Sequence, residues 1–222
     1  MNSPAPYIDH TLLKAETTAD QIRALCEVAV EFGFASVCVP PVFVPLAADL
    51  LYGSDVAAGT VVGFPLGYVD AAVKAFESSR AVASGATELD MVIHLGAAVS
   101  GRLEDVEEEI RQVVEAARGA VVKVIIECCC LTSPLKEALV ECVVRGGAGY
   151  VKTSTGFAAN GATVDDVRLL ARAARGRIGV KAAGGIRDWE GFRALIEAGA
   201  SRIGTSAGVK IFGQWRDRDG IE

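Results

Sequence analysis

An α/β fold with a parallel sheet is predicted by two observations on the sequence. Four times, a segment with helical apolar spacing ends at a Gly-Ala break and an apolar run follows directly, at EFGFASVCV, ASGATELDMVI, RGGAGYVKTS and EAGASRIGTS. Gly suits the left-handed cap that ends a helix, and runs rich in Val and Ile are typical of buried parallel strands. Eight apolar runs in 222 residues predict a TIM (β/α)8 barrel that forms one domain over residues 1–222.

Each apolar run is expected to be one strand of the barrel, with helical segments between the runs. In chain order the runs are YIDHT (7–11), SVCVP (36–40), TVVGF (60–64), ELDMVI (88–93), VKVIIE (122–127), YVKTS (150–154), IGVKAA (178–183) and SRIGTS (201–206). Amphipathic spacing predicts helices over 18–32, 103–117 and 163–174. Thr163, with Asp166 three residues later, and Asp188 are predicted helix caps.

Composition is consistent with one domain and argues against some partners. A hydrophobic content of 51% over 222 residues suffices for one full core, and the length leaves no room for a second domain. The net charge of −6 argues against nucleic acid or an anionic membrane surface as a partner. Any phosphate is therefore expected to be bound locally.

The sequence is expected to be that of a cytoplasmic protein. The segment MNSPAPYIDH lacks the pattern of a secretion signal, and none of the six cysteines forms a CxxC pair, so reduced thiols are expected. The most apolar stretch, residues 34–48, is interrupted by three prolines and is too short to span a bilayer. It is predicted to be a buried strand that continues into a helix.

Two lysines lie in corresponding positions of neighbouring predicted strands. Lys152 in YVKTSTGF and Lys181 in VKAAGGIR are separated by one strand-helix unit, about 30 residues. Two ammonium groups held close together repel each other, which lowers the pKa of at least one of them and gives a neutral amine able to form a Schiff base. A single lysine in such a run is more often one that reaches the rim or pairs with a carboxylate. The matched pair favours the catalytic interpretation.

Two glycine-rich segments follow the last two predicted strands. AAGGIR follows the seventh and GTSAGV the eighth, the places where this fold usually binds phosphate. Their backbone N–H groups at helix starts suit a phosphate dianion. Either segment alone could be a tight turn, but their joint placement favours a phosphate site.

The sequence resembles the deoxyribose-phosphate aldolase family. The motifs IDHTLL, SVCV, VVGFPLG, GATELDMVI, KVIIE, YVKTSTGF, VKAAGGIR and IGTSAGV carry the resemblance, in order and over nearly the whole chain. The resemblance implies a class I aldolase that joins acetaldehyde to glyceraldehyde 3-phosphate reversibly. It implies no metal and no organic cofactor, because the imine itself serves as the electron sink. It leaves the oligomeric state open, with a homo-oligomer (dimer or tetramer) as one possibility.

The resemblance also assigns catalytic roles to three residues. It implies that Lys152 forms the Schiff base, that Lys181 is the second essential lysine, and that Asp90 handles protons. Residue parity supports Asp90 independently, because Leu89 and Met91 would face the helices while Asp90 points into the barrel. A buried carboxylate needs partners, and the two lysines are expected to supply them.

Further positions are implied to contact substrate. The phosphate contacts carry over to Gly156, Gly184, Gly185, Gly204 and Ser206. Asp9 and Thr11, at the end of the first strand, match positions near the substrate hydroxyls and the reacting water. For Asp9, a helix cap or a hydrogen bond that closes the barrel is an equal alternative.

Three features depart from the family pattern. His94 stands where the family often has Asn, which puts a supporting hydrogen bond in doubt. Phe157 replaces a Lys of some members and removes one phosphate contact. The tail GQWRDRDGIE lacks the terminal Tyr of some members, which puts tail-mediated proton transfer in doubt.

Other interpretations explain less of the sequence. GTSAG fits the GxSxG nucleophile elbow at Ser206, but both histidines precede it, whereas that fold needs a later one. The CCC run at 128–130 lacks nearby partners for a metal site. Cys38 could be a reactive thiol at the barrel mouth, with an inert buried thiol as the alternative. A non-enzymatic phosphate-binding barrel would not need Asp90, Lys152 and Lys181 together, and another class I aldolase or transaldolase explains fewer motifs.

Overall fold

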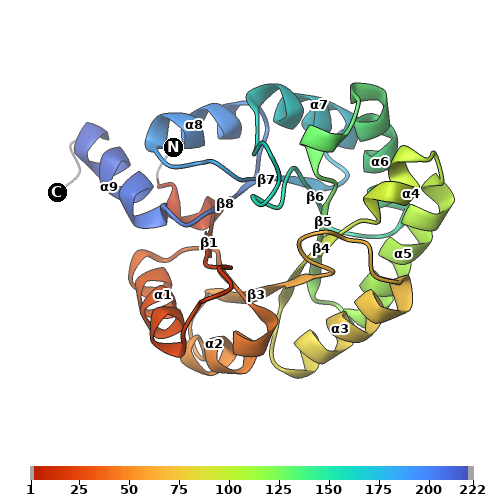
Figure 1. Cartoon of the computed structure of the whole chain (residues 1–222). Coiled ribbons are helices and arrows are strands. Elements are labelled where there is room, and N and C mark those ends of the chain that lie inside the picture. Colours follow the sequence, from red (N-terminus) through yellow and green to blue (C-terminus); the bar gives the residue numbers. More distant parts are fainter. Residues whose placement is uncertain (1–2, 220–222) are drawn as a thin grey trace.

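Parallel strands close into a barrel in chain order in the computed structural model, which describes residues 3–219 (Figure 1). The strands are β1 (Ile8–Thr11), β2 (Ser36–Val39), β3 (Ala57–Val62), β4 (Glu88–Val92), β5 (Val121–Ile125), β6 (Tyr150–Lys152), β7 (Gly179–Ala183) and β8 (Arg202–Thr205). β1 pairs with both β2 and β8, and this pairing joins the first strand to the last. The predicted TIM barrel is confirmed.

Helices surround the strands, from α1 at the red end of the chain to α9 at the blue end (Figure 1). The α-helices are α1 (Ala19–Phe32), α2 (Val44–Leu50), α3 (Ala71–Ala83), α4 (Leu95–Val99), α5 (Leu103–Ala116), α6 (Ser133–Arg145), α7 (Val164–Ala174), α8 (Trp189–Glu197) and α9 (Gly208–Asp219). Short 3₁₀ turns are η1 (Ala5–Tyr7), η2 (Pro41–Phe43) and η3 (Cys128–Cys130). Among residues 3–219, no helix combines the length and apolar composition needed to cross a bilayer.

Local sequence signals explain where the helices begin. Thr163 accepts a hydrogen bond from the Asp166 backbone, and Asp188 accepts one from the Gly191 backbone, so both predicted caps are confirmed. The stretch 34–48 forms β2, the 3₁₀ turn η2 and the first part of α2, as expected. β3 begins three residues earlier than predicted, because the small residues Ala57–Gly59 extend it. A side chain at Gly59 would lie 2.7 Å from a backbone oxygen of β2, so only Gly fits there.

Apolar and charged side chains separate between the two faces of the barrel. Leu89 and Met91 of β4 are buried in the apolar layer between strands and helices. Asp90, between them, points into the barrel and contacts lysines, as residue parity predicts. The helices supply the other half of the apolar layer, for example Val106 and Ile110 of α5. The barrel interior is consequently left for a polar cluster.

A buried ion pair outside the barrel fixes the end of β4. Lys74 of α3 donates to Glu109 of α5 at 2.7 Å and to the Val92 carbonyl at 2.8 Å. Glu109 also accepts from the His94 backbone at 2.6 Å. The His94 ring accepts from Ala97 at 3.0 Å and caps α4, so its side chain serves the helix start after β4.

The C-terminal tail GQWRDRDGIE is mostly helical. Its residues 213–219 form the last part of α9, and residues 220–222 lie outside the described residues. Trp215 is buried and packs edge-on against Phe212, with ring centroids 5.2 Å apart. The described part of the tail therefore contributes to the packing of α9.

Candidate active site

Asp90 lies at the centre of three lysine amino groups inside the barrel. Its Oδ2 accepts from Lys152 Nζ at 2.7 Å and from Lys181 Nζ at 2.6 Å. Its Oδ1 accepts from Lys123 Nζ at 3.0 Å. All four side chains are buried, and they come from β4, β5, β6 and β7. The structure therefore brings together the three residues that the sequence predicts as catalytic and adds Lys123.

A second layer of charges lies below this group. Lys181 also contacts Asp9 Oδ2 at 2.5 Å, and Lys123 contacts Glu88 at 2.6 Å. The guanidinium of Arg202 on β8 donates to Asp9 at 2.7 Å and to Glu88 at 2.8 Å. These ion pairs tie β8 to β1 and to β4 across the barrel.

The cluster holds one more basic side chain than it holds carboxylates. Its bases are Lys123, Lys152, Lys181 and Arg202, and its carboxylates are Asp9, Glu88 and Asp90. Burying a charge without a counter-charge is costly, and the usual response is that the group becomes neutral. One of the four bases is thus expected to be uncharged.

The pKa directions identify that base as Lys152. Burial, followed by the charge of Lys181, lowers the pKa of Lys152 and outweighs the opposing effect of Asp90. Burial also acts to lower the pKa of Lys181, but the carboxylates of Asp9 and Asp90 outweigh it and raise that pKa. The prediction that one lysine pKa is lowered agrees with this result. The main cause differs from the predicted one, since burial contributes more than repulsion between the lysines.

Asp90 stays ionised in this environment. Burial acts to raise its pKa, but the charges of Lys123, Lys152 and Lys181 outweigh it and hold the pKa well below the usual range. Lys123 has a raised pKa, because Asp90, Asp9 and Glu88 outweigh the effect of burial. An ionised carboxylate flanked by protonated and neutral amines can pass protons between them.

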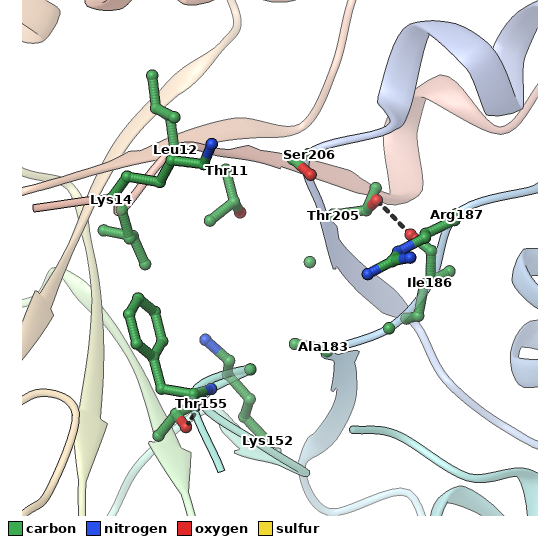
Figure 2. A pocket seen from close by; sticks show the side chains of 16 residues that line it. Thr11, Leu12, Lys14, Lys152, Thr155, Ala183, Ile186, Arg187, Thr205 and Ser206 are labelled. Atoms are coloured by element: carbon green, nitrogen blue, oxygen red, sulfur yellow. Dashed lines mark hydrogen bonds between the residues drawn. The ribbon is translucent and has the colours of Figure 1, made fainter. Parts of the chain in front are cut away.

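A pocket of about 240 Å³ opens above Lys152. Figure 2 shows the amino group of Lys152 and the guanidinium of Arg187 pointing into it from different sides. Lys152 lines this pocket, while Asp90, Lys123 and Lys181 are buried and do not belong to its wall. Lys152 is accordingly the amine of the cluster that a bound molecule can reach.

Most residues predicted to contact substrate lie on the pocket wall. Those that line it are Thr11, Gly156, Gly184, Gly185, Gly204 and Ser206. They come from the ends of β1, β6, β7 and β8, which are far apart in the sequence. Gly204 also has a packing reason to be Gly, since a Cβ there would lie 3.1 Å from the Lys181 side chain.

Asp9 lies below the pocket and not on its wall. Its side chain is fully buried, and its bonds to Arg202 join the first and last strands. The charges of Lys181, Lys123 and Arg202 outweigh the effect of burial and lower its pKa. This placement favours the barrel-closing alternative over direct contact with substrate.

The cysteines of residues 3–219 differ in exposure. Cys38 is buried, and burial raises its pKa to about 11, which keeps the thiol protonated at neutral pH and favours the inert alternative. Cys128 is buried, whereas Cys129 and Cys130 are exposed. Within residues 3–219, no group of three or more His, Cys, Asp or Glu side chains is arranged to hold a metal ion.

Several residues of the site were missed by the sequence interpretation. Lys123, Glu88 and Arg202 complete the buried cluster, and Lys14 and Arg187 line the pocket. The alternation of side chains along a strand could have found Glu88, which is two residues before Asp90 and therefore points to the same side of β4. Lys123 could have been found in the same way, because it lies beside Asp90 on the neighbouring strand β5. Only barrel closure places Arg202 beside Asp9.

Phe157 forms part of the pocket rim. It is more than half exposed and packs edge-on against Phe64, with ring centroids 5.2 Å apart. The family resemblance led us to expect one phosphate contact fewer at Phe157. The pocket wall nevertheless includes two other basic side chains, Lys14 and Arg187.

Comparison with known proteins adds an independent observation. The profile of the DeoC/LacD family aldolases matches residues 5–214. The chain is 59% identical to the deoxyribose-phosphate aldolase of Syntrophotalea carbinolica, covering 98% of each chain, and 55% identical to that of Exiguobacterium sibiricum, covering 93% of this chain and 94% of the other. It superposes with a TM-score of 0.92 on the deoxyribose phosphate aldolase of Aeropyrum pernix, described as a unique tetrameric structure, at 37% identity over 98% of this chain and 94% of the other.

Proposed function

Since the chain belongs to the DeoC/LacD family of aldolases and is a lyase, we propose that it cleaves 2-deoxy-D-ribose 5-phosphate reversibly to acetaldehyde and D-glyceraldehyde 3-phosphate through a Schiff base on Lys152. Relatives named deoxyribose-phosphate aldolase, more than half identical over nearly the whole chain, support the substrate. The proposed setting is deoxyribonucleotide catabolism in the cytoplasm, with residues 1–222 acting as one catalytic domain.

The observation that carries the proposal is the position of Lys152. It is the amine of the buried cluster that lines the pocket, and its amino group points into the hollow (Figure 2). Its pKa is lowered, while those of Lys181 and Lys123 are raised. A Schiff base needs a neutral amine, so accessibility and protonation state both favour Lys152 as the nucleophile.

In the synthetic direction, Lys152 Nζ adds to the carbonyl carbon of acetaldehyde. The carbinolamine loses water to give an imine, and loss of a methyl proton gives an enamine. The enamine carbon attacks the aldehyde carbon of glyceraldehyde 3-phosphate, and hydrolysis of the new imine releases the product and restores the amine. The imine supplies the electron sink, and the proposed reaction needs no further cofactor.

Asp90 and Lys181 are proposed to manage the protons of these steps. Because Asp90 stays ionised and Lys181 has a raised pKa, the proton of this pair resides on Lys181. Asp90 Oδ2 contacts both amines, so it can accept a proton from one and return it through water as the carbinolamine forms and breaks down. Lys181 also supplies positive charge that disfavours protonation of Lys152.

The phosphate is proposed to bind where the loops after β7 and β8 meet the pocket. Gly185 lies shortly before the start of α8, and Ser206 shortly before the start of α9. Glycine-rich loops that lead into helix starts can present backbone N–H groups to an anion. Arg187 and Lys14 add positive charge at the wall. Binding the phosphate there would position the aldehyde carbon near Lys152.

Borohydride trapping tests the proposal. The protein is reduced in the presence of acetaldehyde, digested, and mapped by mass spectrometry, and an ethyl group is expected on Lys152. In parallel, 2-deoxyribose 5-phosphate is supplied and acetaldehyde release is measured. An adduct on another residue would reject Lys152 as the residue that forms the Schiff base. A failure to release acetaldehyde from this sugar would reject it as the substrate.

We also propose that the chain forms a homo-oligomer, a dimer or a tetramer. The Aeropyrum pernix relative is described as tetrameric. Here, large apolar side chains are exposed together on α3 and on the loop before it, at Leu66, Tyr68 and Phe76. Light scattering coupled to gel filtration tests this, and a Phe76→Glu variant that lowers the measured mass would place the interface at α3.

A further inference from the structure

Glu127 has a backbone conformation that is unusual for a residue with a side chain. It lies just after β5, with φ of 54° and ψ of 68°, and it is buried. Residues other than Gly seldom adopt the left-handed region, and those that do are often held there for a functional reason. Gly would adopt this conformation more easily, so the carboxylate itself is expected to have a role.

The Glu127 carboxylate holds the turn at residues 155–157, which follows Lys152 in the chain. Glu127 Oε2 accepts from the Thr155 hydroxyl at 2.5 Å and from the Thr155 backbone N–H at 3.2 Å. The Thr155 oxygen in turn accepts from the Phe157 backbone N–H at 3.0 Å. One buried side chain thereby fixes the conformation of three consecutive residues, 155–157.

This turn forms one wall of the pocket. Thr155, Gly156 and Phe157 all line it, and Gly156 has a φ of 84°. A Cβ at Gly156 would lie 3.7 Å from the backbone of Gly184, in the glycine-rich loop after β7. The turn and that loop therefore lie side by side in close contact, and together they form part of the pocket wall.

Lys152 is held separately from the turn. It is paired with neighbours on both sides of β6. Thr153, the next residue, donates from its backbone to the Lys181 carbonyl at 3.0 Å and accepts from the Cys128 backbone at 2.7 Å. These bonds do not involve the Glu127 side chain, so its loss should affect the turn far more than the nucleophile.

We propose that Glu127 is a positioning residue for the phosphate group of the acceptor aldehyde. It holds the 155–157 turn against the loop after β7, so that the backbones of Gly156 and of that loop form one continuous wall for the phosphate. The inference rests on the proposed function and deepens it, because it assigns the selection of phosphorylated acceptors to a residue that does not touch them.

The test compares two substitutions that place Gly at a residue with positive φ. Glu127→Gly removes the carboxylate and relieves the backbone. Arg175→Gly relieves a similar backbone, with φ of 50°, at the exposed end of α7 and serves as the matched control. For each variant, kcat and KM are measured with D-glyceraldehyde 3-phosphate and with unphosphorylated D-glyceraldehyde, and imine formation with acetaldehyde is measured by borohydride trapping.

Glu127→Gly is expected to raise the KM for the phosphorylated aldehyde at least about tenfold, since loss of positioning affects a well-oriented group strongly. The kcat/KM for unphosphorylated glyceraldehyde and the trapping rate are expected to stay within about threefold of wild type. Arg175→Gly is expected to match wild type in all three. If Glu127→Gly does not fold, Thr155→Val removes the hydroxyl bonds from the other side, with Thr155→Ser as the rescue.

An unchanged ratio of kcat/KM between the two aldehydes in Glu127→Gly would overturn the inference. This includes an equal loss for both aldehydes in a folded variant, which would indicate a merely structural role. A wild-type protein that traps no acetaldehyde would instead reject the proposed function, and the two failures are thus distinguishable.

Discussion

Lys152 and Lys181 face each other across the β6–β7 ladder and share one oxygen of Asp90, yet their pKa values move in opposite directions. The difference comes from Asp9. This carboxylate, from the first strand, lies 2.5 Å from the Lys181 amine and gives it a second counter-charge. Lys152 has Asp90 alone and remains the amine that burial can neutralise. The closure of the barrel by β1 thus decides which of two adjacent lysines has the lowered pKa that the proposed mechanism requires of its nucleophile.

The two lysines are expected to respond differently to substitution. Lys152→Leu should abolish both borohydride trapping and aldol activity. Lys181→Leu should leave Lys152 able to form the imine slowly, because the loss of a neighbouring positive charge and the release of Asp90 both raise the pKa of Lys152. If that pKa returns to about 10.4, roughly one amine in a thousand is neutral at pH ~7.4.

The pH profile of trapping measures this change. A lowered pKa means that neutral Lys152 is already present at lower pH, so the wild-type rate should level off early. The Lys181→Leu rate should continue to climb toward a pH of about 10. A wild-type profile in Lys181→Leu would contradict the electrostatic account, and an adduct on Lys181 in the wild-type protein would reverse the assignment.

The charge count of the buried cluster makes a second prediction. Arg202→Met leaves three bases and three carboxylates, so Lys152 should gain a proton more readily and its pH profile should shift upward. Glu88→Gln leaves four bases and two carboxylates, so the profile should shift downward. A unit charge about 10 Å away at an effective dielectric constant of about 20 corresponds to roughly one pH unit.

Neither Arg202 nor Glu88 forms a hydrogen bond or ion pair with Asp90, Lys152 or Lys181, so we expect both substitutions to act on Lys152 through the charge of the cluster. Breaking a buried ion pair can cost about 3–5 kcal/mol, and a thermal melt of each variant therefore serves as the folding control. Shifts in the same direction for both variants would show that the count of charges does not set the protonation of Lys152.

The sequence predicted the barrel and the meeting of Asp90, Lys152 and Lys181 better than it predicted the surroundings of these residues. Glycine breaks and apolar runs are local signals, and parity alone turns Asp90 inward. Arg202 and Asp9 meet across 193 residues of sequence, and only closure of the barrel makes them partners. The left-handed backbone of Glu127 leaves no trace in residue type, because the sequence around it predicts an ordinary strand end. Long-range charge balance and local strain were therefore the parts that sequence reasoning could not supply.

Cys38 is expected to be unreactive in the folded protein. Burial raises its pKa to about 11, so very little thiolate exists at neutral pH, and the thiolate is the reactive form. Incubation with crotonaldehyde at neutral pH, followed by peptide mass mapping, should give no adduct on Cys38. During this incubation with crotonaldehyde, the Cys38→Ser variant should lose activity at the same rate as the wild-type protein. An adduct on Cys38 that forms in proportion to lost activity would restore the reactive interpretation.

Substitutions of two glycines of the pocket wall, Gly185 and Gly204, are expected to have different effects on phosphate binding and on imine formation. Gly185 has a φ of 80°, and a Cβ there would meet no other atom within 4 Å, so Gly185→Val should narrow the proposed phosphate site without displacing Lys152 or Lys181. Loss of backbone hydrogen bonds to a charged group should raise the KM for glyceraldehyde 3-phosphate about tenfold to a hundredfold. Imine formation with acetaldehyde should change little.

Gly204→Val should behave differently, because its Cβ would lie 3.1 Å from the Lys181 side chain and 3.0 Å from Ala183. It is expected to slow imine formation as well as to weaken phosphate binding. Gly53→Val, with φ of 81° and open space in the turn after α2, imposes the same backbone strain away from the pocket and serves as the control. Steady-state kinetics with phosphorylated and unphosphorylated glyceraldehyde separate the cases. Equal weakening of both aldehydes by Gly185→Val, with Gly53→Val unaffected, would show that the loop after β7 does not bind phosphate.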